Sequence, residues 1–170
     1  MNQSFDMDDV EHFTVGALGE PGSRLFLIQF QQSRTLATLK VEKQQVAGLC
    51  RYLGELLADR ARPGHLPEQL ELRTPLDVDW VVGAIVATYD DVADRIMLFI
   101  EGADTADVPD DPDDIATLRA GITREQAAAV AIRGATLVEA GRSPCPLCGH
   151  PLDPAGHTCP RTNGHRPPEL

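Results

Sequence analysis

The same succession of three short strands and one helix is predicted twice along this chain, and this repeat limits the folds open to it. Residues 15–18 (VGAL) return as 82–85 (VGAI), 24–28 (RLFLI) as 95–100 (RIMLFI), and 36–40 (LATLK) as 115–119 (IATLR). A helical pattern follows each set. Because these four matches keep their order at a nearly constant offset, we interpret them as an internal duplication of a βββα unit.

The first unit is predicted to be an antiparallel meander of three strands followed by a helix. Its strands are expected at residues 13–17, 25–30 and 34–41. From residue 42 to 60 the apolar residues recur at three- and four-residue steps, which predicts one buried stripe on a helix. The stripe consists of Val46, Leu49, Cys50, Leu53, Leu56 and Leu57. Cys50 is therefore interpreted as a small buried hydrophobe rather than a nucleophile.

The second unit is expected to end in a helix over residues 124–140. Thr123 precedes this helix and Gln126 lies three positions later, a capping-box pattern in which each side chain satisfies the other residue's backbone N–H. Gly141 is expected to stop the helix. Residues 61–77 contain prolines and are interpreted as a loop that crosses between the two halves.

Two βββα units can bury each other's apolar surfaces by pairing around a pseudo-twofold axis. The sequence therefore predicts an α+β body over residues 1–141. It has six mainly antiparallel strands in one sheet or partial barrel, two covering helices, and Trp80 at the rim of the core. Residues 1–11 are polar and acidic and are expected to be loosely held. Residues 104–114 are rich in aspartate but lack the ligand order of a calcium loop, so a solvated loop is predicted there.

Residues 145–159 (CPLCGHPLDPAGHTC) hold three of the four cysteines and two of the five histidines. Two thiolates with C-x-x-C spacing on a tight turn can face one metal ion, and Gly149 lets backbone N–H groups turn toward the sulfurs. A following H-x-C pair can close a Cys3His site, the ligand set of structural zinc. The predicted ligands are Cys145, Cys148, His157 and Cys159. The tail, residues 142–170, is therefore predicted to be a zinc knuckle that packs on the body.

The imidazole ligand has two alternatives, His150 and His165. His150 follows Cys148 too closely for comfortable tetrahedral closure, whereas His157 and Cys159, only two positions apart, form a tight pair that a turn can accommodate. A metal-free cluster of reduced thiols and unbound imidazoles is the other interpretation. We favour zinc over it.

Enzyme functions receive little support from the sequence. Redox C-x-x-C pairs lie between a strand and the following helix, but this pair follows a helix and opens a Pro-rich turn. Four candidate ligands within fifteen residues suit a closed zinc site better than a catalytic one, which keeps a position open. Common phosphate-loop, dinucleotide, zinc-protease and hydrolase motifs are absent. His12 and His65 are interpreted as solvated or capping residues.

The charge of the chain, −11 at pH 7, disfavours binding to phosphate backbones over the whole surface. A local contact through Arg142, Arg161 and Arg166 stays open. No apolar run is long enough to span a bilayer, and the acidic N-terminus lacks the order of a signal peptide. We therefore expect a cytoplasmic protein without membrane contact, whose cysteines stay reduced.

Three segments together resemble the DUF3090 family. They are residues 15–29 (VGALGEPGSRLFLIQ), 39–57 (LKVEKQQVAGLCRYLGELL) and 122–166 (ITREQAAAVAIRGATLVEAGRSPCPLCGHPLDPAGHTCPRTNGHR). The tail from Cys145 onward is the most specific part of this likeness. The resemblance implies an actinobacterial, cytoplasmic protein of a zinc-binding type without an established reaction. It also implies gene neighbourhoods that contain a phosphatase-like and a kinase-like protein, and hence a regulatory or complex-forming role.

These observations favour a non-enzymatic scaffold or regulatory protein that holds structural Zn2+ and binds an unidentified protein partner. A nucleic-acid-associated protein that uses the zinc knuckle and the C-terminal arginines is the alternative. A metal-dependent hydrolase or a thiol redox protein is a further alternative.

Overall fold

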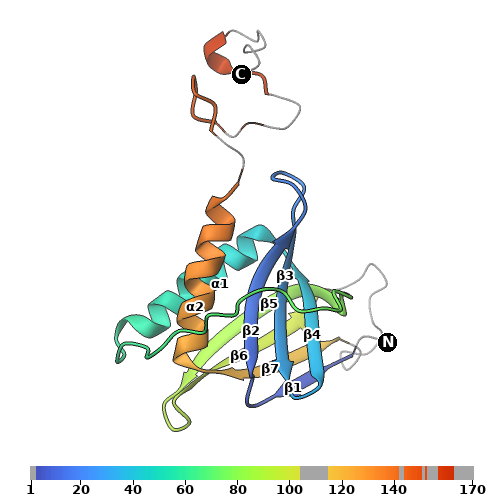
Figure 1. Cartoon of the computed structure of the whole chain (residues 1–170), viewed down its shortest axis with the longest axis vertical. Coiled ribbons are helices and arrows are strands. Elements are labelled where there is room, and N and C mark those ends of the chain that lie inside the picture. The colour runs from blue at the N-terminus through green and yellow to red at the C-terminus, as the bar shows by residue number, and fades with distance from the viewer. Residues whose placement is uncertain (1–2, 104–114, 142–143, 151, 153–156, 163–170) are drawn as a thin grey trace.

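The structure, a computed structural model, describes residues 3–103, 115–141, 144–150, 152 and 157–162 (Figure 1). Its strands are β1 (Phe5–Met7), β2 (His12–Leu18), β3 (Leu25–Gln32), β4 (Thr35–Val41), β5 (Trp80–Asp90), β6 (Arg95–Gly102) and β7 (Thr117–Ile122). Its helices are α1 (Lys43–Ala58), α2 (Arg124–Glu139) and the short 3-10 helix η2 (Pro160–Thr162). Each strand and helix predicted for the two units is present, with ends shifted by a few residues. The predicted acidic loop, residues 104–114, lies outside the described residues.

All seven strands in the described ranges form one sheet in the order β1-β7-β6-β5-β4-β3-β2. β2, β3 and β4 make one antiparallel meander, and β5, β6 and β7 make another. Two parallel pairs complete the sheet, because β4 pairs with β5 and β1 pairs with β7. The prediction of six mainly antiparallel strands is therefore wrong: the sheet is mixed and has a seventh strand.

Both differences have physical causes. After β4, α1 runs alongside β5 in the same direction, and residues 61–79 then carry the chain back to the start of β5, so β4 and β5 are parallel. β1 is only three residues long and lies in an acidic stretch that hides its alternation. Phe5 and Met7 are buried, whereas Asp6 faces outward and pairs with Arg119 at 2.8 Å. The expectation that residues 1–11 are loosely held is wrong from Phe5 onward.

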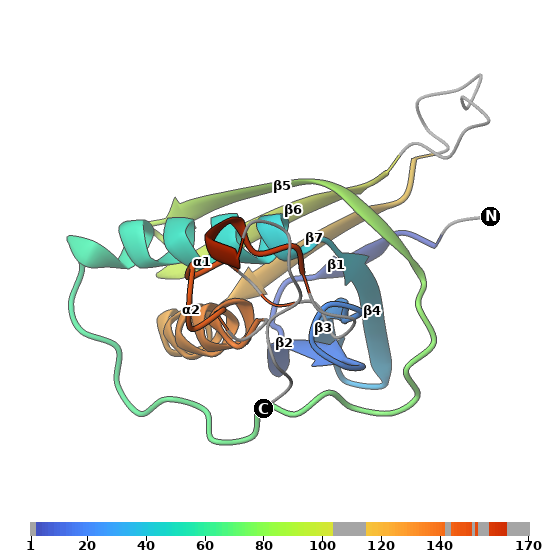
Figure 2. The same cartoon turned by 90° about the horizontal axis from the view of Figure 1, so that it is seen from above.

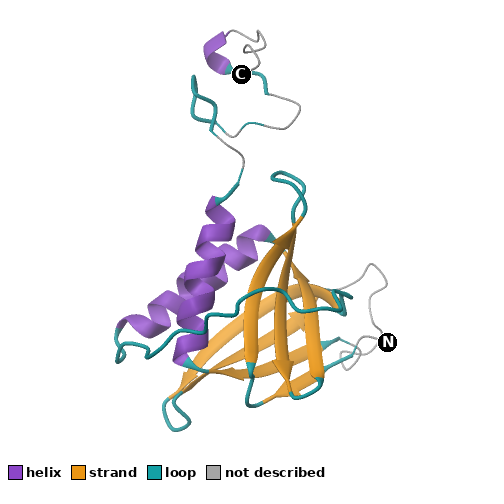
Figure 3. Cartoon of the chain, viewed as in Figure 1, coloured by secondary structure: helices purple, strands orange, loops and turns teal. Residues whose placement is uncertain are grey.

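The two edge strands of the sheet belong to one continuous segment of chain, because β1 leads directly into β2. Between them, the Val10 backbone N–H donates to Gly121 O at 3.1 Å, and the Glu11 N–H donates to Gln31 O at 2.8 Å. The segment thus passes from β7 to β3 while remaining hydrogen-bonded to both. As Figure 3 shows, the sheet curls into a partial barrel with both helices against its open side.

The inside of this barrel holds the apolar core. Phe13 and Phe30 stack with ring centroids 4.8 Å apart, and the helices contribute apolar side chains such as Val46 and Val130. Trp80 is buried at the end of β5, and its Nε1 donates to Gln3 O at 2.9 Å. None of the helices within the described ranges has the length and apolar character to cross a bilayer.

The helices α1 and α2 pack against each other and cross; Figure 2 looks nearly along the axis of α2, with α1 running across the view. The capping box predicted at the start of α2 is present: Gln126 N donates to Thr123 Oγ1 at 3.1 Å, and Thr123 N donates to Gln126 Oε1 at 2.9 Å. Cys50 is buried on α1, as predicted, and Gly134 of α2 lies against it. Because a side chain at position 134 would meet the Cys50 sulfur, the glycine allows the close crossing.

The strap, residues 61–79, crosses the outer face of β2 and β3 (Figure 1). The strap buries polar side chains on this face and on the neighbouring β4, namely His12, Thr14 and Gln29 of β2 and β3 and Thr38 of β4. Gln29 forms two bonds to the backbone of Arg73, donating to its O at 2.9 Å and accepting from its N–H at 2.8 Å. The strap is therefore held on the sheet by hydrogen bonds from side-chain amides and hydroxyls, and not by the backbone pairing that joins neighbouring strands.

His12 is only 5% exposed, and its Nε2 has no hydrogen-bond partner among the described residues. The interpretation of this histidine as solvated or capping is wrong, whereas His65 is exposed. Burial is the main cause that lowers the pKa of His12 below its usual 6.5. The positive charges of Arg73 and Arg133 lower this pKa further, and Glu71 acts in the opposite direction.

The element order strand-strand-strand-helix occurs twice, from β2 to α1 and from β5 to α2. The last strand of each set makes a parallel pair, β4 with β5 of the second set and β7 with β1, the short strand that precedes β2. Matching junctions are what a pseudo-twofold axis along the barrel requires. The duplication itself stays a prediction.

Replacing Gly134 with Ala is expected to lower the free energy of unfolding by about 1–3 kcal/mol. The new Cβ would overlap the Cys50 sulfur, and this overlap outweighs the gain of about 1 kcal/mol in helix propensity. The matched control is Gly54→Ala in α1, where a Cβ meets nothing within 4 Å and stability should rise. Urea unfolding measures both variants, and equal stabilisation would contradict the close crossing.

The lowered pKa of His12 predicts a specific loss of stability in mild acid. The unfolded state binds the proton more readily, so the free energy of unfolding falls as the pH drops through the unfolded-state value of 6.5. His12→Gln should remove this part of the pH dependence, and the control His65→Gln should keep it. Urea unfolding at about pH 7.5 and about pH 5.5, followed by the fluorescence of the single tryptophan, tests this. Identical pH dependence in all three proteins would contradict it.

Candidate metal centre

The candidate centre lies in the tail, beyond the C-terminal end of α2 (Figure 1). A tight turn follows Cys145, in which Gly149 N donates to Cys145 O and Cys145 N donates to His150 O, both at 2.8 Å. Gly149 has φ of 74°, a left-handed conformation that glycine adopts without the strain of a side chain. The turn therefore brings the first two cysteines to one side, as their spacing predicts.

The structure brings all four predicted ligand residues together. Their ligand atoms lie within 4.8 Å of one another: Cys145 Sγ, Cys148 Sγ, His157 Nε2 and Cys159 Sγ. The two sulfurs of Cys145 and Cys159 are 4.0 Å apart, about twice the length of a disulfide bond. Cys148 Sγ and His157 Nε2 are 3.2 Å apart.

These separations resemble the edges of a zinc tetrahedron. Zn–S bonds of about 2.3 Å and Zn–N bonds of about 2.05 Å place two sulfurs about 3.8 Å apart and a sulfur and a nitrogen about 3.6 Å apart. The observed 4.0 Å and 3.2 Å differ from these values by a few tenths of an ångström. Small side-chain adjustments would therefore be enough for the four residues to bind one metal ion.

Backbone N–H groups stabilise negative charge on the sulfurs. Burial acts to raise the pKa of the Cys145 thiol, but the N–H groups of Cys148 and Leu147, together with the side chains of Cys148 and Cys159, outweigh it and lower this pKa overall. At Cys148, burial raises the thiol pKa, and the neighbouring cysteines raise it further, although the His150 N–H opposes this. One thiolate is therefore favoured in the cluster, and further deprotonation calls for a nearby cation.

The alternative histidines do not join the cluster. His150 is exposed and takes part through its backbone, and His165 lies outside the described residues. His157 Nδ1 is buried and has no partner within the described part of the tail. A metal-binding histidine usually donates a hydrogen bond from its second nitrogen, so we expect a hydrogen-bond acceptor beside His157 Nδ1 when a metal is bound.

The rest of the described chain shows no second cluster of this kind. Burial raises the pKa of Cys50 to about 11, which suits a buried hydrophobe and not a nucleophile. The sequence analysis missed a cavity of about 490 Å³ at the end of the barrel, where α2 ends. Its lining residues come from separate segments of the chain, and no local spacing pattern connects them. The division into a body of residues 1–141 and a tail of residues 142–170 stays a prediction. So does the packing of the tail on the body.

Comparison with known proteins adds one finding. No curated protein and no solved structure matches the chain. A family model described as "Protein of unknown function (DUF3090)" matches residues 5–159, which include the barrel, both helices and all four residues of the cluster. The chain therefore belongs to the DUF3090 family of proteins of unknown function.

Proposed function

We propose that Cys145, Cys148, His157 and Cys159 bind one structural zinc ion. We further propose that the protein is a non-enzymatic scaffold whose zinc-ordered tail docks on a partner protein. The observation that carries the proposal is the convergence of three sulfurs and one imidazole nitrogen within 4.8 Å. Thiolates and imidazole are the donors that zinc prefers, and reduced thiols of this kind fit a cytoplasmic protein.

The donor set favours a structural role over a catalytic one. Four protein ligands complete the tetrahedral coordination of zinc and leave no position for water or substrate. The group contains no carboxylate that could act as a general base beside the metal. Cys145 and Cys159 are also buried, which suits ligands that stay bound to the ion.

The tail needs the ion because it has little apolar surface to bury. Leu147 and Leu152 are its described leucines, and Leu147 is 46% exposed. A segment without an apolar core gains its folding free energy from metal binding. The zinc ion would therefore fix the turn at Cys145–Cys148 in one conformation.

A turn fixed in this way is suited to binding another protein. Leu147 lies between the two cysteines of the turn and exposes an apolar side chain beside a rigid backbone. Arg161 is exposed in η2, whereas Arg142 and Arg166 lie outside the described residues. An exposed leucine on a preorganised turn binds at a low entropic cost, which favours a protein partner.

Protein purified after growth in zinc-supplemented medium is expected to hold about one zinc ion per chain. His157→Ala should lose most of this zinc during dialysis, because it removes one of the four ligands. His150→Ala is the matched control and should retain the ion, since His150 lies outside the cluster. Elemental analysis of the three proteins tests the assignment. Zinc retention by His157→Ala with zinc loss from His150→Ala would show that His150, and not His157, is the fourth ligand.

Cys148→Ser should release the metal while the barrel and both helices persist. The reason is that none of the described residues of the tail belongs to the apolar core of the barrel. Circular dichroism together with Trp80 fluorescence measures the body. Unfolding of the whole protein would show that the division between body and tail is wrong.

The docking role predicts that a partner binds only the zinc-loaded tail with its leucine. Affinity capture from the native host should recover a partner with the wild type but not with Cys148→Ser. Leu147→Ser should retain zinc and still lose the partner. Nuclease treatment of the extract distinguishes the nucleic-acid alternative. Equal capture by all three proteins would place the interface elsewhere.

A further inference from the structure

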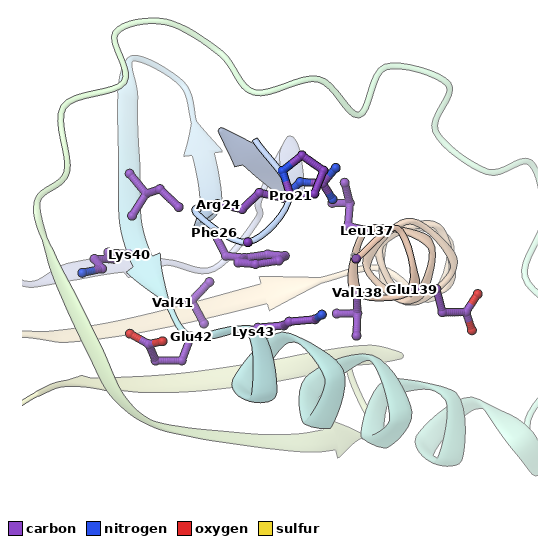
Figure 4. Close-up of a pocket in the computed structure, with 13 residues that line it drawn as sticks. Pro21, Arg24, Phe26, Lys40, Val41, Glu42, Lys43, Leu137, Val138 and Glu139 are labelled. Carbon is purple, nitrogen blue, oxygen red and sulfur yellow. The ribbon is translucent and has the colours of Figure 1, made fainter. Parts of the chain in front are cut away.

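The cavity of about 490 Å³ lies between β3, β4, the start of α1 and the end of α2 (Figure 4). Its volume is within the range of small-molecule sites in proteins, about 300–1,000 Å³. Phe26 and Val41 form part of its wall and are direct cross-strand partners. Leu137 and Val138 of α2 extend this apolar surface from the opposite side. The cavity therefore offers an apolar wall made from both the sheet and a helix.

Three cationic side chains border the same cavity, Arg24, Lys40 and Lys43. Arg24 donates from one guanidinium nitrogen to Ala140 O at 2.7 Å, which leaves further N–H donors for a ligand. Figure 4 shows the Lys43 side chain lying along the cavity toward Val138. An added Cβ at Gly141 would be 3.1 Å from the Lys43 Nζ, so this ammonium lies beside the end of α2.

None of these three cations has an ion pair within the described part of the chain. Other cations of this acidic protein do pair with carboxylates: Arg51, Arg60, Arg95, Arg119 and Arg124. The sequence has 26 acidic and 15 basic residues, yet three cations that make no ion pair among the described residues border this one cavity. The cavity thus carries local positive charge in an acidic protein.

Two carboxylates also border the cavity but do not neutralise it. Glu42 is the N-cap of α1, and its side chain accepts a hydrogen bond from the backbone N–H of Gln45. Figure 4 shows the carboxylates of Glu42 and Glu139 pointing away from Phe26 at the centre. The Lys43 ammonium therefore lies toward the apolar wall, whereas the Lys40 ammonium and both carboxylates point away from Phe26.

We propose that this cavity binds a small organic anion with an apolar body. The anionic group is bound by the Lys43 ammonium and the remaining N–H groups of Arg24. The apolar body packs on Phe26, Val41 and the two apolar residues of α2. This inference goes beyond the proposed function, since it uses no residue of the metal cluster.

The test uses octanoate as the anionic probe and octanol as its uncharged counterpart, with the full-length zinc-loaded protein. Titration followed by 1H–15N correlation spectra should shift the amide signals of residues 24–26, 40–43 and 137–141. Octanoate should bind more tightly than octanol, because only octanoate meets the cations. Lys43→Gln should weaken octanoate about five- to tenfold, and Lys43→Arg should retain it.

The matched control is Arg51→Gln, which makes the same charge change on the exposed face of α1 and away from the cavity. It should leave octanoate binding unchanged. Octanol binding as tightly as octanoate, signal shifts elsewhere in the barrel, or equal weakening by Arg51→Gln and Lys43→Gln would each overturn the proposal. So would an absence of octanoate binding, since Arg24 and Lys43 would then serve only the carbonyl end of α2.

Discussion

The tail brings three sulfur atoms and one imidazole nitrogen within 4.8 Å of one another, and this arrangement limits which charges the four side chains can carry. As thiolates, the cysteines would repel one another at this separation, and a divalent cation among them turns the repulsion into coordination. The N–H groups of Leu147 and Cys148 already favour negative charge on Cys145. The four residues could therefore bind one metal ion, and the order and the docking role that we propose for the tail both depend on that ion.

The body reaches its own order in another way, by closing a sheet around apolar side chains. The N-terminal segment is essential to this closure, since β1 pairs with β7 while β2 pairs with β3. Closure leaves polar side chains on the outer face of β2 and β3, and the strap covers them. It also places the cavity with Arg24 and Lys43 at the end of the barrel, where α2 ends and the tail begins. The cavity for which we propose a ligand thus shares no residue with the metal cluster.

The features that could be predicted from the sequence are those formed by residues a few positions apart in the chain. The capping box of Thr123 and Gln126, the buried stripe around Cys50 and the C-x-x-C turn were all predictable, because each depends on spacings of a few residues. The direction of β4 relative to β5 and the short strand β1 depend on contacts between distant segments. The burial of His12 was missed for the same reason, since it requires the strap to fold over β2.

The most direct test of the account is X-ray absorption at the zinc edge, measured on the full-length protein. We predict a four-coordinate ion with three sulfur neighbours at about 2.3 Å and one nitrogen neighbour at about 2.05 Å. This result would match the four atoms that the structure brings together. A shell dominated by oxygen, or a fifth ligand from water, would contradict a closed structural site and would reopen the catalytic alternative.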